Sequence, residues 1–131
     1  MTKSTTITSN EVMKQGHLWV APIWSHTANK FVGRPIVITG NDSANDKLGL
    51  IVNFVTRTPA RNDFDVDLKH WKYAGLNSPS RVRTSKPLTI LKKDLNQTLF
   101  ERNGVRQPRG YIGKLHEEDL ANVLEMCRLI Y

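Results

Sequence analysis

Two uninterrupted apolar runs of strand length constrain the fold of this chain more than any other feature. They lie in Arg34–Thr39 (RPIVIT) and in Leu48–Thr56 (LGLIVNFVT), and the turn-forming residues Gly40-Asn41-Asp42 follow the first. A strand with one solvated face alternates apolar and polar residues, whereas a continuous apolar run indicates a strand covered on both faces. The two runs therefore predict neighbouring strands at the centre of the domain.

Shorter segments on both sides also have strand character. Phe64–Leu68 alternates apolar and acidic residues, which predicts a half-exposed strand with its acids facing solvent. Branched and aromatic residues predict four more strands, at His17–Ile23, Ser80–Thr84, Leu88–Leu91 and Tyr111–Leu115. The polar stretch Trp24–Gly33 is expected to be a loop, Lys69–Leu76 could form one helical turn that ends at Gly75, and residues 92–108 give no clear pattern.

The C-terminal segment predicts an amphipathic helix. Leu120, Val123, Leu124, Cys127 and Ile130 recur at helical spacing, and residues 117–119 are acidic, which suits the positive end of a helix dipole. Cys127 lies on the apolar side, so we expect a buried residue and not a nucleophile. The fold class is thus mainly β with a C-terminal helix, in a bent barrel or half-open barrel. Residues 1–15 are expected to be a flexible N-terminal tail before one domain over residues 16–131.

Charge and composition narrow the class of function. Nineteen Lys and Arg against twelve Asp and Glu give a net charge of +7, which favours polyanionic partners, nucleic acid first. The single cysteine cannot form an intramolecular disulfide, which suits a reducing compartment. Because no apolar run approaches the roughly 18 residues of a membrane span, and the first ten residues are polar, we expect a cytoplasmic protein without membrane contact.

Metal and cofactor motifs are missing from the sequence. Asp63, Asp65 and Asp67 imitate the start of a calcium loop, but Leu68 and Ala74 occupy the positions that require Gly and Glu. The four histidines have no ligand spacing, and there is no phosphate-binding glycine motif and no GxSxG. We therefore expect no metal and no cofactor.

Arginines and hydroxyl residues near strand ends remain as candidate chemistry. RNA cleavage needs little from a protein because the 2′-OH of the substrate is the nucleophile. The protein must stabilise the charge of the phosphorane and assist proton transfer, and guanidinium groups suit the first task through paired hydrogen bonds to phosphate oxygens. A histidine could transfer protons near neutral pH. From the residues alone, a structural role is the more common one for arginines and threonines near strand ends.

Several segments, in order, resemble the PemK/MazF family of bacterial toxins. The strongest similarities are Gly33–Asp42, with the Arg-Pro strand and polar turn, and Gly75–Arg83, with the Gly-Leu-x-x-Pro-Ser-x-Val-Arg pattern. Weaker ones are Gly16–Ala21, Leu50–Thr56, and Ile112–Leu115 together with Glu118–Leu120. The resemblance implies an SH3-like barrel of the CcdB-like type, a homodimer, an acidic antitoxin, and sequence-selective cleavage of single-stranded mRNA that leaves a 2′,3′-cyclic phosphate.

The resemblance also implies residue roles. Arg34 and Thr56 fall on catalytic positions of the family, Arg83 falls on an arginine that stabilises the transition state in some members, and His26 lies in a loop with a functional histidine in others. Arg34 or His26 would transfer protons, although a free arginine is a poor base because its pKa exceeds about 12. RNA contact is assigned to Lys30, Arg57, Arg81, Ser85 and Lys86.

Some departures from the family keep two alternatives open. Arg57 stands where Ser is usual after the threonine, and Ser85 stands where some members have an Asp. One alternative is a gyrase-targeting toxin on the same fold, but those proteins end in Trp-Gly-Ile and this sequence ends Arg128–Tyr131. The other is a barrel that binds RNA or protein without cutting.

Overall fold

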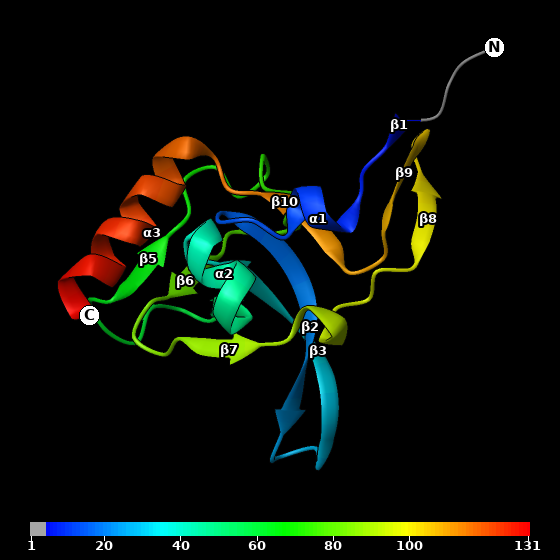
Figure 1. Ribbon diagram of the computed structural model, residues 1–131. Helices are drawn as coiled ribbons and strands as arrows, with labels where there is room; N and C mark the ends of the chain where they lie inside the picture. The colour runs from blue at the N-terminus through cyan, green and yellow to red at the C-terminus, as the bar shows by residue number, and fades with distance from the viewer. Residues whose placement is uncertain (1–4) are drawn as a thin grey trace.

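The chain folds around a large antiparallel sheet, with a small sheet at one end and a helix at the other (Figure 1). The computed structural model describes residues 5–131, without the side chains of residues 46–48. The helices are α1 (Ser9–Val12), α2 (Asp42–Leu48), the 3-10 turn η1 (Lys92–Asp94) and α3 (Glu117–Ile130). The strands are β1 (Thr5–Thr6), β2 (His17–Ser25), β3 (Lys30–Ile38), β4 (Leu50–Thr56), β5 (Asp65–Asp67), β6 (Arg81–Arg83), β7 (Leu88–Ile90), β8 (Leu99–Arg102), β9 (Val105–Pro108) and β10 (Tyr111–Lys114).

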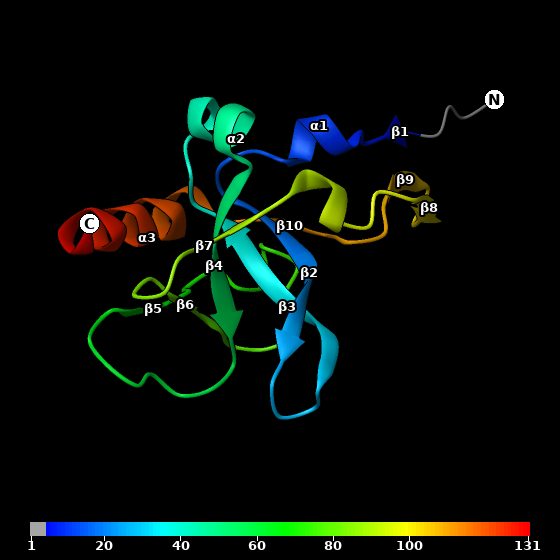
Figure 2. The same ribbon diagram turned by 60° about the horizontal axis from the view of Figure 1, so that its bottom comes forward.

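The large sheet curves into a partly open barrel. Its strand order is β10-β2-β3-β4-β6-β5, and β7 also pairs with β4. The small sheet has the order β1-β9-β8 and lies on the side of the molecule away from α3, while the β2–β3 hairpin projects from the body in both views (Figures 1 and 2). The expectation of a mainly β fold with a C-terminal helix is confirmed.

The two apolar runs form the adjacent central strands β3 and β4, as expected. Ile36 and Ile38 pack into one apolar cluster, whereas Val37 between them packs into a second cluster on the opposite face of the sheet. On β4, Val52 packs into the first cluster and Val55 into the second. Both faces of these strands are therefore covered, which explains why their sequences do not alternate.

The turn at residues 69–76 attaches α3 to the sheet. Asp119 in the first turn of α3 is fully buried, and its carboxylate accepts the backbone N–H groups of Lys69 and His70 at 2.9 and 2.8 Å. Gly75 has a φ of +89°, and a Cβ on Gly113 would lie 2.2 Å from the carbonyl oxygen of Ala74. Glycine is thus required where this turn approaches β10.

Four expectations need correction. The stretch Trp24–Gly33, expected to be a loop, instead completes β2 and begins β3. Gly40-Asn41-Asp42 leads into α2, because the Asn41 side chain accepts the N–H of Ala44 and caps the helix. Val12 and Met13 belong to the stretch expected to be a flexible tail, yet both are buried in the core; residues 1–4 of that stretch lie outside the described residues. The acids of β5 do not all face solvent, since the Asp65 side chain is only 1% exposed.

Residues 92–108 contain η1 and the β8–β9 hairpin, where no pattern was recognised. Within the described part of the chain, no helix is long and apolar enough to cross a membrane.

Candidate active site

A groove opens where β3 and β4 separate. β3 pairs with β2 as far as Ser25 and Lys30, but its pairing with β4 ends at Ile36 and Phe54. Beyond that pair, the two strands and the chain that enters β6 enclose a groove of about 750 Å³. Its lining comes from three segments: Gly33, Arg34 and Pro35 of β3; Val55, Thr56, Arg57 and Thr58 at the end of β4; and Leu76, Asn77, Ser78 and Ser80 before β6.

Arg34 enters the groove from β3 and is exposed to solvent. Its guanidinium carbon lies 5.3 Å from the centre of the Phe54 ring. A cation above an aromatic face is attracted by the ring quadrupole, and this attraction uses none of the N–H donors of the guanidinium. Phe54 thus supports the Arg34 guanidinium while its donors can still bind an anion.

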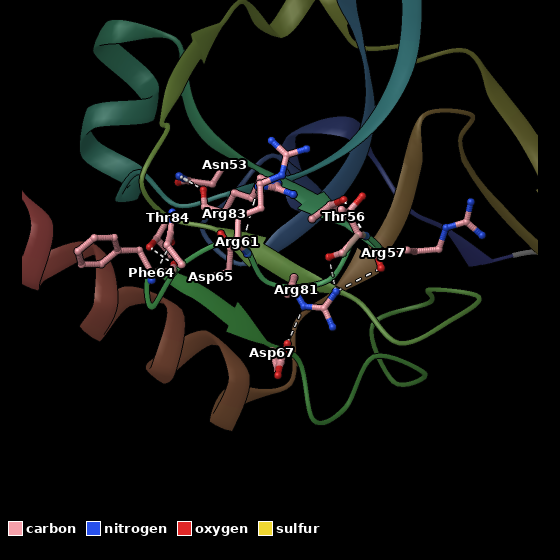
Figure 3. Close-up of polar contacts among 12 residues, drawn as sticks. Asn53, Thr56, Arg57, Arg61, Phe64, Asp65, Asp67, Arg81, Arg83 and Thr84 are labelled. Atoms are coloured by element: carbon pink, nitrogen blue, oxygen red, sulfur yellow. Dashed lines mark hydrogen bonds and ion pairs between the residues drawn. The ribbon is translucent and has the colours of Figure 1, made fainter.

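The hydroxyl of Thr56 is oriented by the next turn. Its Oγ1 accepts the backbone N–H of Thr58 at 3.1 Å, so its own O–H is the polar group left to donate. Arg57 between them is exposed, and its side chain extends away from Arg81 (Figure 3). The Ser78 Oγ is shielded from solvent and has no hydrogen-bond partner among the described residues. Arg34, Thr56 and Arg57, which the sequence offered as site candidates, therefore line one groove.

Arg81 and Arg83 of β6 are held by acids of β5. The register places Asp67 beside Arg81 and Asp65 beside Arg83. Arg83 Nη1 lies 3.7 Å from Asp65 Oδ2, its side chain is 14% exposed, and it does not line the groove. Arg81 donates from Nε to Asp67 Oδ1 at 2.7 Å (Figure 3). Both guanidinium charges are thus partly offset by a neighbouring carboxylate.

The remaining residues expected in the site lie elsewhere. Lys30 begins β3 at the hairpin end, and His26 lies in the turn beyond it. Arg34 pairs with Ala21, and the last pair of the hairpin, Ser25 with Lys30, lies four residues further, roughly 14 Å away at ~3.4 Å per residue; His26 follows in the turn. Ser85 and Lys86 occupy the connection from β6 to β7. None of these four lines the groove.

Among the described residues, no His, Cys, Asp or Glu lines the groove, where the side chains are aliphatic, hydroxyl, amide or guanidinium. Folding does bring ligand atoms of His70, His116 and Glu118 within 4.8 Å of one another near the start of α3, which their sequence positions did not suggest. The two carboxylate oxygens of Glu118 accept from Lys69 at 2.9 Å and contact His70 at 3.1 Å, and these bonds lower the pKa of Glu118 to about 2. The imidazoles of His70 and His116 stack at 3.9 Å. These contacts fasten the helix to the turn at residues 69–76.

The sequence of this chain matches a known protein family over most of its length. The family model of PemK-like and MazF-like toxins of type II toxin–antitoxin systems matches residues 14–131. The chain belongs to the PemK/MazF toxin family. Comparison with curated protein sequences gives no significant match.

Solved structures share the fold of this PemK/MazF toxin at low sequence identity. A mycobacterial endoribonuclease in complex with its cognate antitoxin has 13% identity and a TM-score of 0.66, with 89% of this chain and 92% of that chain covered. The Mycobacterium tuberculosis toxin MazF-mt6 has 22% identity and a TM-score of 0.57, with coverage of 88% and 98%. A MazE–MazF structure from Deinococcus radiodurans has 15% identity and a TM-score of 0.58, with coverage of 89% and 92%.

Several residues in or beside the groove of the toxin do not stand out in the sequence. Phe54 is not part of the groove lining, and its contact with Arg34 depends on the register of β3 and β4. Asn77, Ser78 and Ser80 were noticed only as part of the family pattern. A polar run of small residues directly before a strand was the available signal, because such residues often line sites at strand ends.

Proposed function

We propose that this toxin is an endoribonuclease that cuts single-stranded RNA in the groove between β3 and β4, without a metal ion. The observation that carries the proposal is the convergence of Arg34, Thr56 and Arg57 on one groove, with Arg34 supported by Phe54 and the Thr56 hydroxyl left as a donor. These groups all bind phosphate oxygens well. The family and the endoribonuclease names of similar structures agree with this reading.

The chemistry would use the substrate's own nucleophile. The 2′-oxygen attacks the adjacent phosphorus, the bond to the 5′-oxygen breaks, and the product carries a 2′,3′-cyclic phosphate. The 2′-hydroxyl would give its proton to water as the bond to phosphorus forms, and the departing 5′-oxygen would take a proton from water, because no His, Asp or Glu of the described residues lines the groove. Arg34 would donate two hydrogen bonds to the non-bridging oxygens, and Thr56 would donate a third. Donors fixed in advance stabilise the charge that grows in the transition state more than that of the ground state.

Arg57 would bind a neighbouring phosphate, since its exposed charge lies at the rim of the groove. Arg83 lies outside the groove lining, and its ion pair with Asp65 competes with direct contact to RNA. It would therefore act on RNA only through the positive potential near the groove. His26 and Lys30 would meet the RNA further along the projecting hairpin, and the sequence of the RNA would be read by bases exposed in the single strand.

We further propose that the toxin is a homodimer that binds an acidic antitoxin in the cytoplasm. Large apolar side chains are exposed at several places, among them Trp24 and Phe31 on the hairpin, and Leu129 and Tyr131 at the end of α3. Exposed apolar surface of this kind is typical of protein contacts. The net charge of +7 favours an acidic partner over the groove, which would order as it binds.

Incubation with a long, defined RNA in excess EDTA, followed by mapping of the new 5′ ends, tests the proposal. We expect cleavage at a small set of related sites at the same rate with and without the chelator. Loss of cleavage in EDTA, restored by Mg²⁺ or Zn²⁺, would overturn the metal-free mechanism. Tight RNA binding without any cut would favour the binding module instead.

A further inference from the structure

Arg81 lies on β6, the middle one of three neighbouring strands, directly after Ser80 of the groove lining. β6 runs between β4 and β5, and Arg81 pairs in register with Thr56 on one side and with Asp67 on the other. Side chains at paired positions of neighbouring strands share one face of a sheet. The guanidinium of Arg81 can therefore reach across the sheet from β5 to the end of β4, and its side chain is only 16% exposed.

The hydrogen bonds of Arg81 form a continuous connection to Thr56 (Figure 3). Nε donates to Asp67 Oδ1 at 2.7 Å, and Nη1 donates to the carbonyl oxygen of Arg57 at 3.2 Å and to that of Thr58. The N–H of Thr58 in turn donates to Thr56 Oγ1 at 3.1 Å. Asp67 thus fixes Arg81, and Arg81 fixes the two peptide groups that follow Thr56.

This connection determines what the Thr56 hydroxyl can do. A threonine hydroxyl has one O–H to donate, and its oxygen can accept. While the Thr58 N–H occupies an acceptor site, the O–H can turn to an oxygen in the groove. Without Arg81, the carbonyls of residues 57 and 58 lose their donor, the turn can rotate, and the hydroxyl loses its fixed orientation. Small displacements of a donor from its productive position weaken catalysis strongly.

We propose that Arg81 is a positioning residue, held by Asp67, which orients the Thr56 hydroxyl through the turn at residues 57 and 58. It is not a ligand of the RNA, because its charge is paired with Asp67 and its Nη1 is occupied by two carbonyl oxygens. The earlier assignment of Arg81 to RNA contact is replaced by this role. The inference rests on the proposed function of the groove.

The test compares Arg81→Met, which keeps the length of the side chain without its donors, with Arg57→Met in the same turn and with Arg109→Met. Arg109 is exposed and lies over Phe100 outside the groove, so it is a matched control for the loss of one surface arginine. Single-turnover cleavage, RNA affinity, its salt dependence and thermal melting are measured for each variant.

We expect Arg81→Met to slow cleavage at saturating RNA by roughly 10- to 100-fold while affinity changes less than about 2-fold. The slope of log affinity against log salt should stay as in the wild type, whereas Arg57→Met should reduce it by about 0.7, one phosphate contact on a single strand. Arg109→Met should match the wild type. A reduced slope with an unchanged saturating rate in Arg81→Met would make it an RNA ligand and overturn the proposal.

Hydrogen exchange of the Thr58 amide, measured by NMR without RNA, separates this inference from the proposed function. The amide should exchange faster in Arg81→Met than in the wild type, while amides of the central strand β4 keep their protection. Equal exchange in the two proteins overturns the inference. A wild type that cuts no RNA overturns the proposed function instead. If Arg81→Met melts far earlier, Arg81→Lys carries the same measurements, because it keeps the charge but cannot hold Asp67 and both carbonyls together.

Discussion

Substitution of Arg34 by lysine separates the positive charge of this residue from its paired hydrogen-bond donors, and so tests the proposed chemistry of the groove. Lysine keeps the positive charge but replaces the planar, two-edged donor with a point charge on a flexible stem. It also weakens the contact with Phe54, where the guanidinium carbon is 5.3 Å from the ring centre. The ground state therefore loses little, since one unit charge still faces the phosphate.

The expected magnitude follows from the number of donors lost. A preorganised donor to a developing oxyanion is worth about 10²- to 10³-fold in rate, or about 2.7–4 kcal/mol. We expect Arg34→Lys to reduce the single-turnover rate by that factor, while the salt slope of RNA binding stays unchanged. The loss of the exposed cation–π contact should cost the fold about 0.5–1 kcal/mol at most.

The assay measures single-turnover cleavage of a short RNA that contains one mapped site, together with affinity and thermal melting. Arg109→Lys is the matched control, because Arg109 lies 5.1 Å from the centre of the Phe100 ring outside the groove. The reasoning is refuted if Arg34→Lys cleaves at the rate of this control. It is also refuted if the loss of activity tracks a large fall in melting temperature, since Arg34 would then support the fold.

Three further predictions concern Thr56, Asn53 and His17. Thr56→Val should cut roughly 10- to 100-fold more slowly with unchanged melting, while Thr56→Ser keeps most of the rate; equal rates for the two in a cleavage assay would remove the hydroxyl from the mechanism. Asn53 is fully buried, accepts a hydrogen bond from the Thr39 hydroxyl at 2.7 Å and donates one to the carbonyl of Arg83 at 2.9 Å. Asn53→Ala should therefore lower the free energy of unfolding, measured by urea denaturation, by about 2–4 kcal/mol. A change below about 1 kcal/mol would contradict this. Burial and the nearby Lys114 lower the pKa of His17 to about 4, so the folded state resists protonation of this side chain. The free energy of unfolding should therefore fall as the pH drops from 6.5 to 4, by about 1–2 kcal/mol at pH 5 relative to pH 7. Urea unfolding curves of His17→Gln should lack this part of the pH dependence.

The central architecture could be predicted because it depends on local pattern. The continuous runs of β3 and β4 and the helical period of α3 each reflect burial that every residue of the segment experiences. Where one residue suits two kinds of local structure, the sequence pattern did not distinguish between them. Asn41 is a good turn residue and a good helix cap, and only the chain that follows decides between them.

The sequence predicted Arg34 and Thr56 as candidate site residues, but it did not predict which side chains pair with the arginines of β6. Arg34 and Thr56 are brought together by the pairing of two strands that the sequence already placed side by side. The roles of Arg81 and Arg83 depend on the register of β5 against β6, which sets Asp67 and Asp65 beside them. A shift of two residues would keep the same faces but exchange the partners, and an alternating sequence pattern does not distinguish these registers.

The central claim is that this groove cuts RNA with the substrate's own 2′-hydroxyl and with protein donors alone. The most direct measurement uses two short RNAs in EDTA that differ only at the mapped cleavage site, one with ribose and one with 2′-deoxyribose. We expect the all-ribose RNA to give a 5′-hydroxyl fragment and a 2′,3′-cyclic phosphate by mass spectrometry, and the deoxy RNA to bind without being cut. Cleavage of the deoxy RNA, or a 5′-phosphate product, would contradict it.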